Sequence, residues 1–315
     1  MEKIEHLLQN PKQKTVIIFC GPTAVGKTSA AISLAKHFSA EIISADSRQC
    51  FKELNIGVAR PSAKELKEIP HHFIASYSIT ENINAAFFEQ YALNKVNELF
   101  KKHAVVIIVG GTGLYIKAFC EGLDEIPEVK PEIRSQVIKT YKEKGLGWLQ
   151  KEVRKKDPAF YAVGEIQNPQ RMMRALEVIE STGRSILEFR KNKKTGRDFN
   201  IIKIGLELPK EELQNNINSR VDKMIKDGLV EEVSSLIGYR DVNALQTVGY
   251  PEIFEHLDGK ISLATAIEEI KKKTRQYAKR QMTWFKKDKE INWINANQGD
   301  EITRMAQKLA DQGLK

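Results

Sequence analysis

Residues 21–28, with the sequence Gly-Pro-Thr-Ala-Val-Gly-Lys-Thr, have the types and spacing of a phosphate-binding loop. Gly21 and Gly26 allow several backbone N–H groups to face one anion, and a helix that begins near Lys27 directs its positive dipole end to the same place. Lys27 supplies a compact cation, and Thr28 supplies a hydroxyl that can ligate Mg²⁺. The residues of this loop are Gly21, Pro22, Thr23, Ala24, Val25, Gly26, Lys27 and Thr28. The spacing predicts phosphate binding but specifies neither a nucleotide nor a kinase.

Two further polar segments follow apolar runs. Asp46 opens the segment Asp46-Ser-Arg-Gln49, where a carboxylate could bind Mg²⁺ through water, act as a general base or cap the next turn. The second segment is Gly110-Gly-Thr-Gly113, in which Thr112 offers a hydroxyl and a plain tight turn is the alternative. An ATPase commonly has an aspartate after such a strand to hold Mg²⁺. Its absence here argues against an ordinary ATPase.

The elements that must position these segments alternate between strand and helix. The runs at 15–19, 41–46 and 104–109 are typical of buried strands, and helical patterns at 28–38 and 85–103 lie between them. This alternation predicts an α/β fold with a parallel sheet, like the core of P-loop NTPases. Sites in such sheets form at the carboxyl ends of the strands, where all three polar segments fall.

The remaining chain divides into a helical insertion and a return to the core. Residues 123–199 contain several prolines and short helical patterns, with little strand signal. A strand pattern resumes at 201–208, and helical patterns continue to the end, including a tail helix over 300–315. We therefore predict a discontinuous catalytic core, residues 1–122 and 200–315, with a helical insertion domain at 123–199.

The formal net charge of +9 is concentrated in two blocks. Residues 128–200 carry 17 basic and 10 acidic residues, and residues 271–289 carry nine basic residues and one acidic residue. The rest of the chain is net acidic. This distribution predicts a polyanionic partner such as a nucleic acid, and two solvated helix faces are the alternative.

The second basic block also contains aromatic residues at helical spacing. Tyr277 and Trp284 fall on one helix face, where packing in the core is favoured over stacking on bases. Lys272, Arg275 and Lys279 share another face. That basic face suits a phosphate backbone, which positions a partner without reading its sequence.

The composition argues against several other classes of protein. The longest apolar runs, 16–20 and 104–109, are far shorter than the roughly 20 residues of a membrane helix, so no membrane partner is expected. Residues 1–6 lack the layout of a signal peptide. The three cysteines share no metal-type spacing and fit a reducing cytosol. The pair His71-His72 is more typical of an exposed loop than of a metal site.

Taken in order, these segments resemble the tRNA dimethylallyltransferase family, also called tRNA isopentenyltransferases. Four further segments carry the resemblance, at residues 168–178, 220–233, 246–250 and 274–285. Each segment alone is moderately specific, whereas the ordered set, spanning about residues 15–294, is highly specific. Since no Cys or His follows His256, the chain resembles the bacterial form without a C-terminal zinc finger.

The resemblance implies a reaction. Dimethylallyl diphosphate would donate its five-carbon group to N6 of the adenine 3′-adjacent to a tRNA anticodon, and diphosphate would leave. The loop at 21–28 would hold that leaving group beside Mg²⁺ on Thr28, which accounts for the missing aspartate. Asp46 would be the general base, Arg220 would stabilise charge on the diphosphate, and Thr112 would lie near the reacting atoms.

The resemblance also implies a surface for the anticodon stem-loop of tRNA. The insertion would grip it through residues 170–174, and the target base would leave its stack to reach the site. The residues expected to contact tRNA are Asp46, Ser47, Arg48, Gln49, Thr112, Arg134, Gln170, Arg171, Met172, Met173, Arg174, Gln246, Arg275, Lys279 and Arg280. Whether Arg48 or Gln49 contacts the adenine stays open.

Three other functions are compatible with parts of the pattern. A small-molecule P-loop kinase would have the phosphate loop but no use for two basic blocks. A prenyltransferase that acts on free adenine nucleotides would share the site but not the tRNA. A non-catalytic RNA-binding module would need neither the loop nor Asp46. We expect a cytoplasmic, monomeric tRNA prenyltransferase that uses Mg²⁺.

Overall fold

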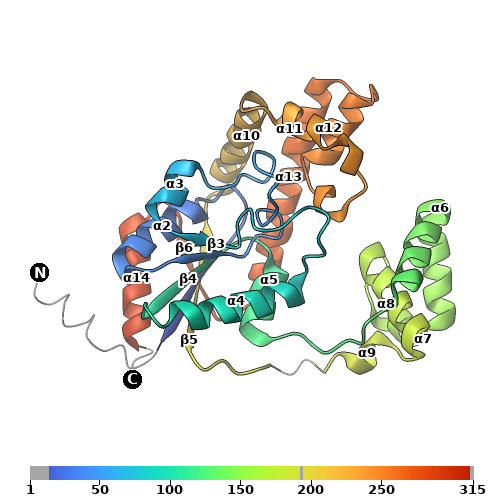
Figure 1. The fold of residues 1–315 in the computed structure, drawn as a ribbon, viewed down its shortest axis with the longest axis horizontal. Coiled ribbons are helices and arrows are strands. Elements are labelled where there is room, and N and C mark those ends of the chain that lie inside the picture. Colours follow the sequence, from blue (N-terminus) through green and yellow to red (C-terminus); the bar gives the residue numbers. More distant parts are fainter. Residues whose placement is uncertain (1–13, 192–193, 313–315) are drawn as a thin grey trace, which may run out of the picture. The chain divides into compact units, whose positions relative to one another are not determined.

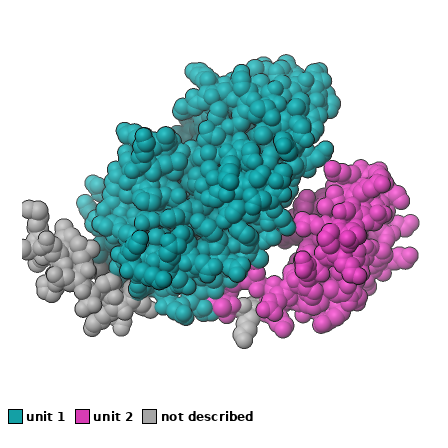
Figure 2. All heavy atoms as spheres, viewed as in Figure 1, with its two compact units in different colours: residues 1–120, 196–315 teal, residues 121–195 magenta. Residues whose placement is uncertain are grey.

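The structure is a computed structural model that describes residues 14–191 and 194–312. The segment at 1–6 and the last three residues of the predicted tail helix lie outside the described residues. The chain divides into two compact units, shown in separate colours in Figure 2. Unit 1 comprises residues 1–120 and 196–315, and unit 2 comprises residues 121–195. Unit 1 is therefore built from two separate stretches of the chain.

Within the described residues, unit 1 contains a six-stranded parallel sheet with the strand order β3-β2-β4-β1-β5-β6 (Figure 1). The strands are β1 (Thr15–Cys20), β2 (Ile42–Ser44), β3 (His71–His72), β4 (Val105–Val109), β5 (Asn200–Glu207) and β6 (Ile291–Asn295). The central strand β1 pairs with β4 on one side and with β5 on the other, so that Ile17 lies opposite Ile107 and Ile202. β1 and β4 are buried along their whole length, as continuous apolar runs require. The predicted parallel α/β fold is confirmed.

The helices of unit 1 cover both faces of this sheet. They are α2 (Lys27–Phe38), α3 (Ala63–Glu68), α4 (Ala85–Leu99), α5 (Gly113–Glu121), α10 (Lys210–Lys226), α11 (Leu229–Ser235), α12 (Tyr250–Leu257), α13 (Leu263–Phe285) and α14 (Gly299–Gln312), with short 3₁₀ turns at Ile237–Tyr239 and Asn243–Leu245. Ile17 and Phe19 face one layer with α2 and α14. Val16 and Ile18 face the other layer, which includes α4, α5, α12 and α13. Alternating side chains of one strand thus fill two hydrophobic layers.

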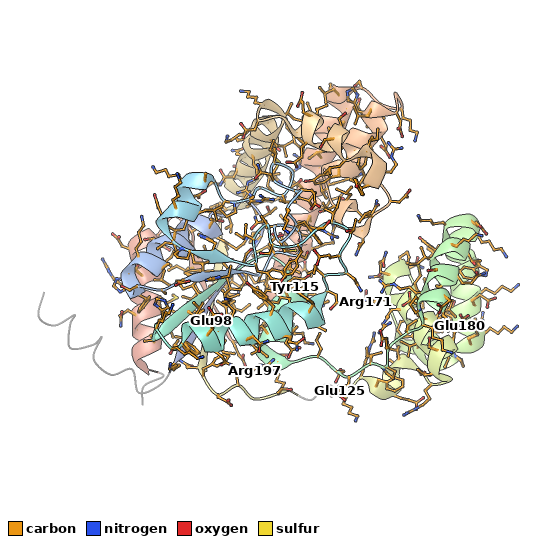
Figure 3. The ribbon with its side chains drawn as sticks, viewed as in Figure 1. Glu98, Tyr115, Glu125, Arg171, Glu180 and Arg197 are labelled. Atoms are coloured by element: carbon orange, nitrogen blue, oxygen red, sulfur yellow. The ribbon has the colours of Figure 1, made fainter. Side chains whose placement is uncertain are left out.

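The start of β5 is fixed by a single arginine. Arg197, labelled in Figure 3, donates to the carbonyl oxygens of Ala118 and Phe119 at the end of α5. It also forms an ion pair with Glu89 of α4 at 2.8 Å. These contacts hold the returning chain against α4 and α5, where β5 can align with β1.

Unit 2 is helical, as predicted, and its longest helix is interrupted at Gly145, where φ is 72°. Its helices are α6 (Pro131–Lys156), α7 (Pro158–Val163), α8 (Pro169–Thr182) and α9 (Ile186–Phe189). A proline stands at the start of α6, α7 and α8, where the missing N–H costs nothing. The buried Asp157 caps α7 through Phe160 N–H and accepts a hydrogen bond from Ser185. Leu149, Phe160 and Leu176 form part of the unit's own core.

A search of the described helices for a membrane span finds none with sufficient length and apolar character.

Candidate active site

The three polar segments predicted from the sequence meet at the carboxyl edge of the sheet. The phosphate loop follows β1, Asp46 follows β2 and Gly110 follows β4. The backbone joins them directly, since Ala45 N–H donates to Val109 O at 2.7 Å and Gly110 N–H donates to Phe19 O at 3.0 Å. The parallel topology therefore places residues from three distant segments around one cavity.

The phosphate loop has a backbone that needs its glycines. Gly21 has φ 142°, and a Cβ there would lie 2.6 Å from the carbonyl oxygen of Leu206. Gly26 has φ 96° and begins α2. The N–H groups of residues 24–26 make no hydrogen bond with the described residues. Several donors at the start of a helix are therefore available to an anion.

Lys27 lies inside this loop. Its Nζ donates to Gly21 O at 3.0 Å and to Pro22 O at 2.6 Å. Burial, with a further contribution from the positive charge of Arg220, lowers the pKa of Lys27 to about 8. Lys27 is held by carbonyl oxygens and repelled by a second cation, so an anion that binds between these cations would be stabilised.

The second cation, Arg220, comes from α10. Its Nη1 donates to Thr23 Oγ1 at 3.2 Å, so this arginine contacts the phosphate loop directly. Burial lowers its pKa, and the charge of Asp46 acts in the opposite direction. The structure therefore places Arg220 beside the loop, as expected for a residue that contacts phosphate.

One carboxylate oxygen of Asp46 caps the next turn, which is one of the roles that the sequence allowed for this residue. Its Oδ1 accepts the N–H groups of Arg48 at 2.9 Å and Gln49 at 3.2 Å. Its Oδ2 accepts no hydrogen bond from the described residues, and the side chain lines the same cavity as Lys27. The turn thus fixes the carboxylate while one oxygen remains available to a ligand.

Gln49 and Arg48 differ in what their side chains already contact. The Gln49 amide accepts from Ser44 Oγ at 3.3 Å and donates to the carbonyl oxygens of Val58 at 3.1 Å and Ala59 at 3.0 Å. The guanidinium of Arg48 makes no hydrogen bond with the described residues. Gln49 therefore supports the cavity wall, whereas Arg48 retains free donors.

Thr112 joins the second and third polar segments. Its Oγ1 accepts Ser47 N–H at 3.1 Å and donates to Ser47 Oγ at 3.3 Å. Gly110 and Gly111 line the cavity, whereas Thr112, the next residue in the chain, is not among the residues that line it. The hydroxyl expected near the reacting atoms therefore also holds Ser47 in place beside Asp46.

The loop at residues 55–60 forms a wall that the sequence did not reveal. Glu232 of α11 accepts the N–H groups of Asn55 at 3.1 Å, Ile56 at 2.7 Å and Gly57 at 3.0 Å. The same carboxylate accepts the hydroxyl of Tyr250 at 2.8 Å. Because Glu232 lies more than 170 residues away along the chain, no local pattern could pair it with this loop.

The cavity enclosed by these segments has a volume of about 770 Å³. The polar residues that line it include Lys27, Asp46 and Arg220. The apolar residues that line it include Ile56, Val58, Ala59, Pro61, Leu66, Ile74 and Met224. A cavity of this size lined by both cations and apolar side chains suits a small ligand with both an anionic and an apolar part.

Gln281 of α13 is a site residue that the sequence interpretation missed. Its Oε1 accepts Thr23 N–H at 2.8 Å, and its Nε2 donates to Gly111 O at 2.9 Å. It is buried on the same helix face as Ala278 and Phe285. A polar residue at an apolar-face position was the signal that could have identified it.

Tyr277 and Trp284 of α13 do not pack in the core, contrary to the prediction. Tyr277 is 38% exposed and lines the cavity, and Trp284 is 37% exposed and lies against Gly113. The buried face of α13 is instead the one that carries Ala278 and Phe285. Tyr277 is therefore placed at the cavity, where a planar ligand can reach it.

The basic residues of α13 differ in how far they are paired. Lys272 pairs with Glu269 at 3.0 Å, and Arg275 donates to Asn218 at 2.7 Å. Lys279 is exposed and forms no ion pair with the described residues. The guanidinium of Arg280 lies 5.8 Å from the ring centroid of Tyr277.

Gln246, another predicted contact, is exposed outside the cavity. Its Nε2 donates to Arg240 O at 2.7 Å. It lies just after the second 3₁₀ turn and before α12.

The residues of unit 2 that were predicted to contact tRNA differ in exposure and in pairing. Arg134 on α6 and Gln170 and Arg171 at the start of α8 are exposed. Arg171 pairs with Glu165, and the half-buried Arg174 pairs with Glu177.

Met172 and Met173 have different surroundings. They are 0% and 6% exposed and belong to the hydrophobic core of unit 2. The direct contact with tRNA expected for them is therefore not available in this structure. Their place is to hold the first turn of α8, which presents Gln170 and Arg171.

The histidine pair is not an exposed loop. His71 and His72 form β3 and are half-buried. Glu41 accepts hydrogen bonds from His72 at 2.6 Å and from His103 at 3.2 Å. In the part of the chain that the structure describes, no group of three His, Cys, Asp or Glu side chains is arranged to hold a metal. The cysteines Cys20, Cys50 and Cys120 form no disulfide bond with the described residues.

Comparison with known families shows which family the chain belongs to. The family model of IPP transferase matches residues 49–288. The chain belongs to the IPP transferase family. It is 49% identical to the tRNA dimethylallyltransferase of Christiangramia forsetii, over 91% of this chain and 95% of that protein. It is 44% identical to tRNA dimethylallyltransferase 1 of Bacteroides thetaiotaomicron, over 91% of this chain and 94% of that protein.

Solved structures of IPP transferases have the same fold. The full-length tRNA isopentenylpyrophosphate transferase of Bacillus halodurans aligns with a TM-score of 0.70 and 32% identity, covering 95% of this chain and 98% of that one. A eukaryotic dimethylallyltransferase acting on tRNA aligns with a TM-score of 0.73 and 26% identity, covering 90% of this chain and 74% of that one. The resemblance predicted from the motifs is therefore confirmed at the level of family and fold.

Proposed function

We propose that this chain is a tRNA dimethylallyltransferase. It transfers the dimethylallyl group of dimethylallyl diphosphate to N6 of the adenine 3′-adjacent to the anticodon and releases diphosphate. The observation that carries this proposal is the cavity, which combines a phosphate loop, a fixed carboxylate and an apolar wall. Relatives of similar length that are named tRNA dimethylallyltransferase support it.

The diphosphate and the five-carbon chain of the donor match the two kinds of residue that line the cavity. Its diphosphate would accept the N–H groups of residues 24–26 and the charged donors of Lys27 and Arg220. Its five-carbon chain would lie along apolar residues such as Ile56 and Met224.

We propose Asp46 as the general base of the acceptor reaction. Adenine N6 attacks the first carbon of the donor, the carbon–nitrogen bond forms and the bond to the diphosphate oxygen breaks. The N6 proton passes to Oδ2 of Asp46, the oxygen that the turn leaves available. Lys27 and Arg220 stabilise the charge that develops on the departing diphosphate. We propose Thr112 as the residue that keeps Ser47 and Asp46 aligned for this transfer.

The donor set of the cavity fits a divalent cation such as Mg²⁺. Thr28 offers a hydroxyl in this cavity, and substrate phosphates and water commonly supply most of the other ligands to Mg²⁺. The diphosphate oxygens of the donor would supply further ligands to the ion. When bound, the ion would neutralise charge on the diphosphate.

The tRNA would be held by both units. We propose contacts to the anticodon stem-loop from Lys279, Arg280 and Arg275 on α13 and from Gln246 in unit 1. Unit 2 would contribute Arg134, Gln170, Arg171 and Arg174. Arg48, whose guanidinium is free, is a better candidate than Gln49 for the adenine, and Tyr277 offers a ring to it. Because the proposed acceptor is tRNA, we expect a cytoplasmic enzyme, and we propose that it acts as a monomer.

The test is a transfer reaction with a defined product. Unmodified tRNA is incubated with dimethylallyl diphosphate and MgCl₂, and mass spectrometry of the tRNA before and after reaction identifies the added group and the nucleotide that carries it. A parallel reaction offers AMP and ATP as acceptors. A third offers ATP with nucleotide acceptors, which a small-molecule kinase would phosphorylate.

The expected product is a tRNA heavier by one dimethylallyl group on the adenine beside the anticodon. Prenylation of free AMP with unmodified tRNA would instead identify a prenyltransferase of free nucleotides. Turnover of ATP without prenyl transfer would overturn the proposal in favour of a kinase. Binding of tRNA without either reaction would identify a non-catalytic RNA-binding protein.

A further inference from the structure

One buried side chain of α13 links two segments of the cavity that are far apart in the sequence. Gln281 Oε1 accepts Thr23 N–H at 2.8 Å, and Gln281 Nε2 donates to Gly111 O at 2.9 Å. Thr23 belongs to the phosphate loop after β1, and Gly111 belongs to the turn after β4. Both ends of a single amide are therefore used to join the two segments.

Gln281 is also held firmly from its own helix. It is 6% exposed and lies between Ala278 and Phe285 on the buried face of α13. Ion pairs fix α13 to its neighbours, from Lys271 to Asp222 of α10 and from Lys273 to Glu252 of α12, both at 2.8 Å. The amide is therefore presented by a rigid helix rather than by a mobile side chain.

We infer that Gln281 is a positioning residue that holds the phosphate loop and the Gly110–Gly111 turn at a fixed separation, and so sets the affinity for the diphosphate of the donor. The inference rests on the proposed function. Gln281 accepts a hydrogen bond from the N–H of Thr23, while Arg220 donates one to the hydroxyl of the same residue. With Thr23 fixed at both groups, the next three N–H groups of the loop are oriented before the anion arrives.

Gly111 fits this role because any side chain there would displace the glutamine. A Cβ on Gly111 would lie 2.3 Å from Gln281 Nε2, closer than atoms can approach without movement. The backbone of Gly111 does not have a positive φ, so close approach, not conformation, requires glycine here. A substitution of either Gly111 or Gln281 can therefore break the contact between them.

The first test compares two matched substitutions on α13. Gln281→Met keeps the side-chain length and removes both hydrogen bonds, whereas Gln276→Met makes the same change at an exposed position of the same helix. Calorimetry measures binding of inorganic pyrophosphate with MgCl₂, and filter binding measures tRNA affinity. Gln281→Met should weaken pyrophosphate binding and raise KM for the donor by about ten- to a hundredfold, the loss typical when a supporting contact lets a binding group shift.

The same variant should leave tRNA affinity nearly unchanged, because the cations of α13 stay in place. Gln276→Met should match the wild-type protein in every measurement. An equal loss of pyrophosphate and tRNA binding in Gln281→Met would show that the residue supports the helix in general and would overturn the inference. Unchanged pyrophosphate binding would do the same.

A double-mutant cycle distinguishes this contact from general damage to the fold. Gly111→Ala alone should raise KM for the donor, because its methyl group displaces Gln281. In the background of Gln281→Ala, where that amide is gone, Gly111→Ala should have little further effect. Fully additive effects on pyrophosphate binding would contradict a shared contact.

Failure of the inference can be distinguished from failure of the proposed function. A wild-type protein that binds pyrophosphate and prenylates tRNA, with a Gln281→Met variant of equal donor affinity, would overturn only the inference. A wild-type protein that binds pyrophosphate without prenylating tRNA would overturn the proposed function, while the variant could still confirm the role of Gln281 in anion binding.

Discussion

Two groups of charged side chains, one at each edge of the parallel sheet, differ in whether they are paired with protein partners. At the carboxyl edge, Lys27 and Arg220 are held by carbonyl and hydroxyl oxygens and form no ion pair with the described residues. At the amino edge, Glu41 accepts hydrogen bonds from His72 and His103. Near the start of β5, Arg197 likewise pairs with Glu89.

The difference separates stability from function. A buried charge that lacks an opposite partner costs free energy, which the fold tolerates where a ligand will supply that partner. The charged groups at the amino edge already have protein partners, so they do not need a ligand to supply one. Substitutions at the carboxyl edge should therefore change binding and rate, and substitutions at the amino edge should change the free energy of unfolding.

The largest expected effect is at Asp46. In Asp46→Asn the side-chain oxygen can still accept the N–H groups of Arg48 and Gln49, so the turn should persist while the base is lost. We expect kcat to fall by about 10²–10⁴-fold, the usual contribution of general base catalysis. Asp46→Ala, which also removes the cap, should abolish transfer.

The measurement is single-turnover transfer to tRNA, with tRNA affinity and thermal unfolding measured in parallel. Both variants should bind tRNA nearly as the wild type does, and Asp46→Asn should keep the unfolding temperature. A near-normal rate in Asp46→Asn would show that another group takes the N6 proton.

The opposite result is expected at Glu41 on the amino edge. Glu41→Gln loses the charge and one of the two oxygens that face His72 and His103, and should cost about 1–3 kcal/mol in the free energy of unfolding at neutral pH. The rate of transfer per folded molecule should not change. Glu68→Gln, which alters a surface pair with Lys36, is the control with a smaller expected loss. Urea unfolding and kcat together test the contrast.

The pH dependence of this loss has a definite sign. Burial alone would raise the pKa of Glu41, but the hydrogen bonds from His72 and His103 outweigh it and lower the pKa below the ordinary 4.5. A lowered carboxyl pKa contributes stability above its unfolded value and loses it as the pH falls through the folded value. The wild-type protein and Glu41→Gln should therefore converge in acid. A constant difference would point to packing instead.

The carboxyl edge was largely predictable from the sequence, because its signals are local. The phosphate loop at 21–28, Asp46 after a short strand and Gly110–Gly111 after an apolar run are each recognised within a few residues. Parallel topology then brings them together without further information. The same reasoning failed at β3, since a two-residue strand such as His71–His72 has no period to detect.

The residues that support the site were missed because their partners are distant in sequence. Gln281 contacts Thr23 across 258 positions, and Glu232 contacts Asn55 across 177. Strand β6 was also missed, since Ile291–Asn295 is only partly buried and follows a long basic helix. Local patterns identify a binding loop, but only the folded chain shows what holds it still.

Lys27 should give the carboxyl edge a pH dependence of its own. Its pKa is lowered from 10.5 to about 8, so above that pH the amine of the free enzyme loses its proton and its attraction for diphosphate. We expect kcat/KM for the donor to fall by up to about tenfold per pH unit above pH 8, since that ratio reports the free enzyme. Thermal unfolding measured over pH 7–9 excludes loss of fold. A flat profile would show that Lys27 stays charged.

The smallest expected effect concerns the exposed cations. Lys279 near the carboxyl edge and Lys36 at the far end of α2 are both exposed lysines, but Lys36 already pairs with Glu68. If Lys279 neutralises a tRNA phosphate, Lys279→Ala should lower the slope of log K against log salt by about one. Lys36→Ala removes the same charge from the protein and should leave the slope unchanged. Equal slopes in all three proteins would mean that α13 does not contact the phosphate backbone, and equal reductions would mean that only total charge matters.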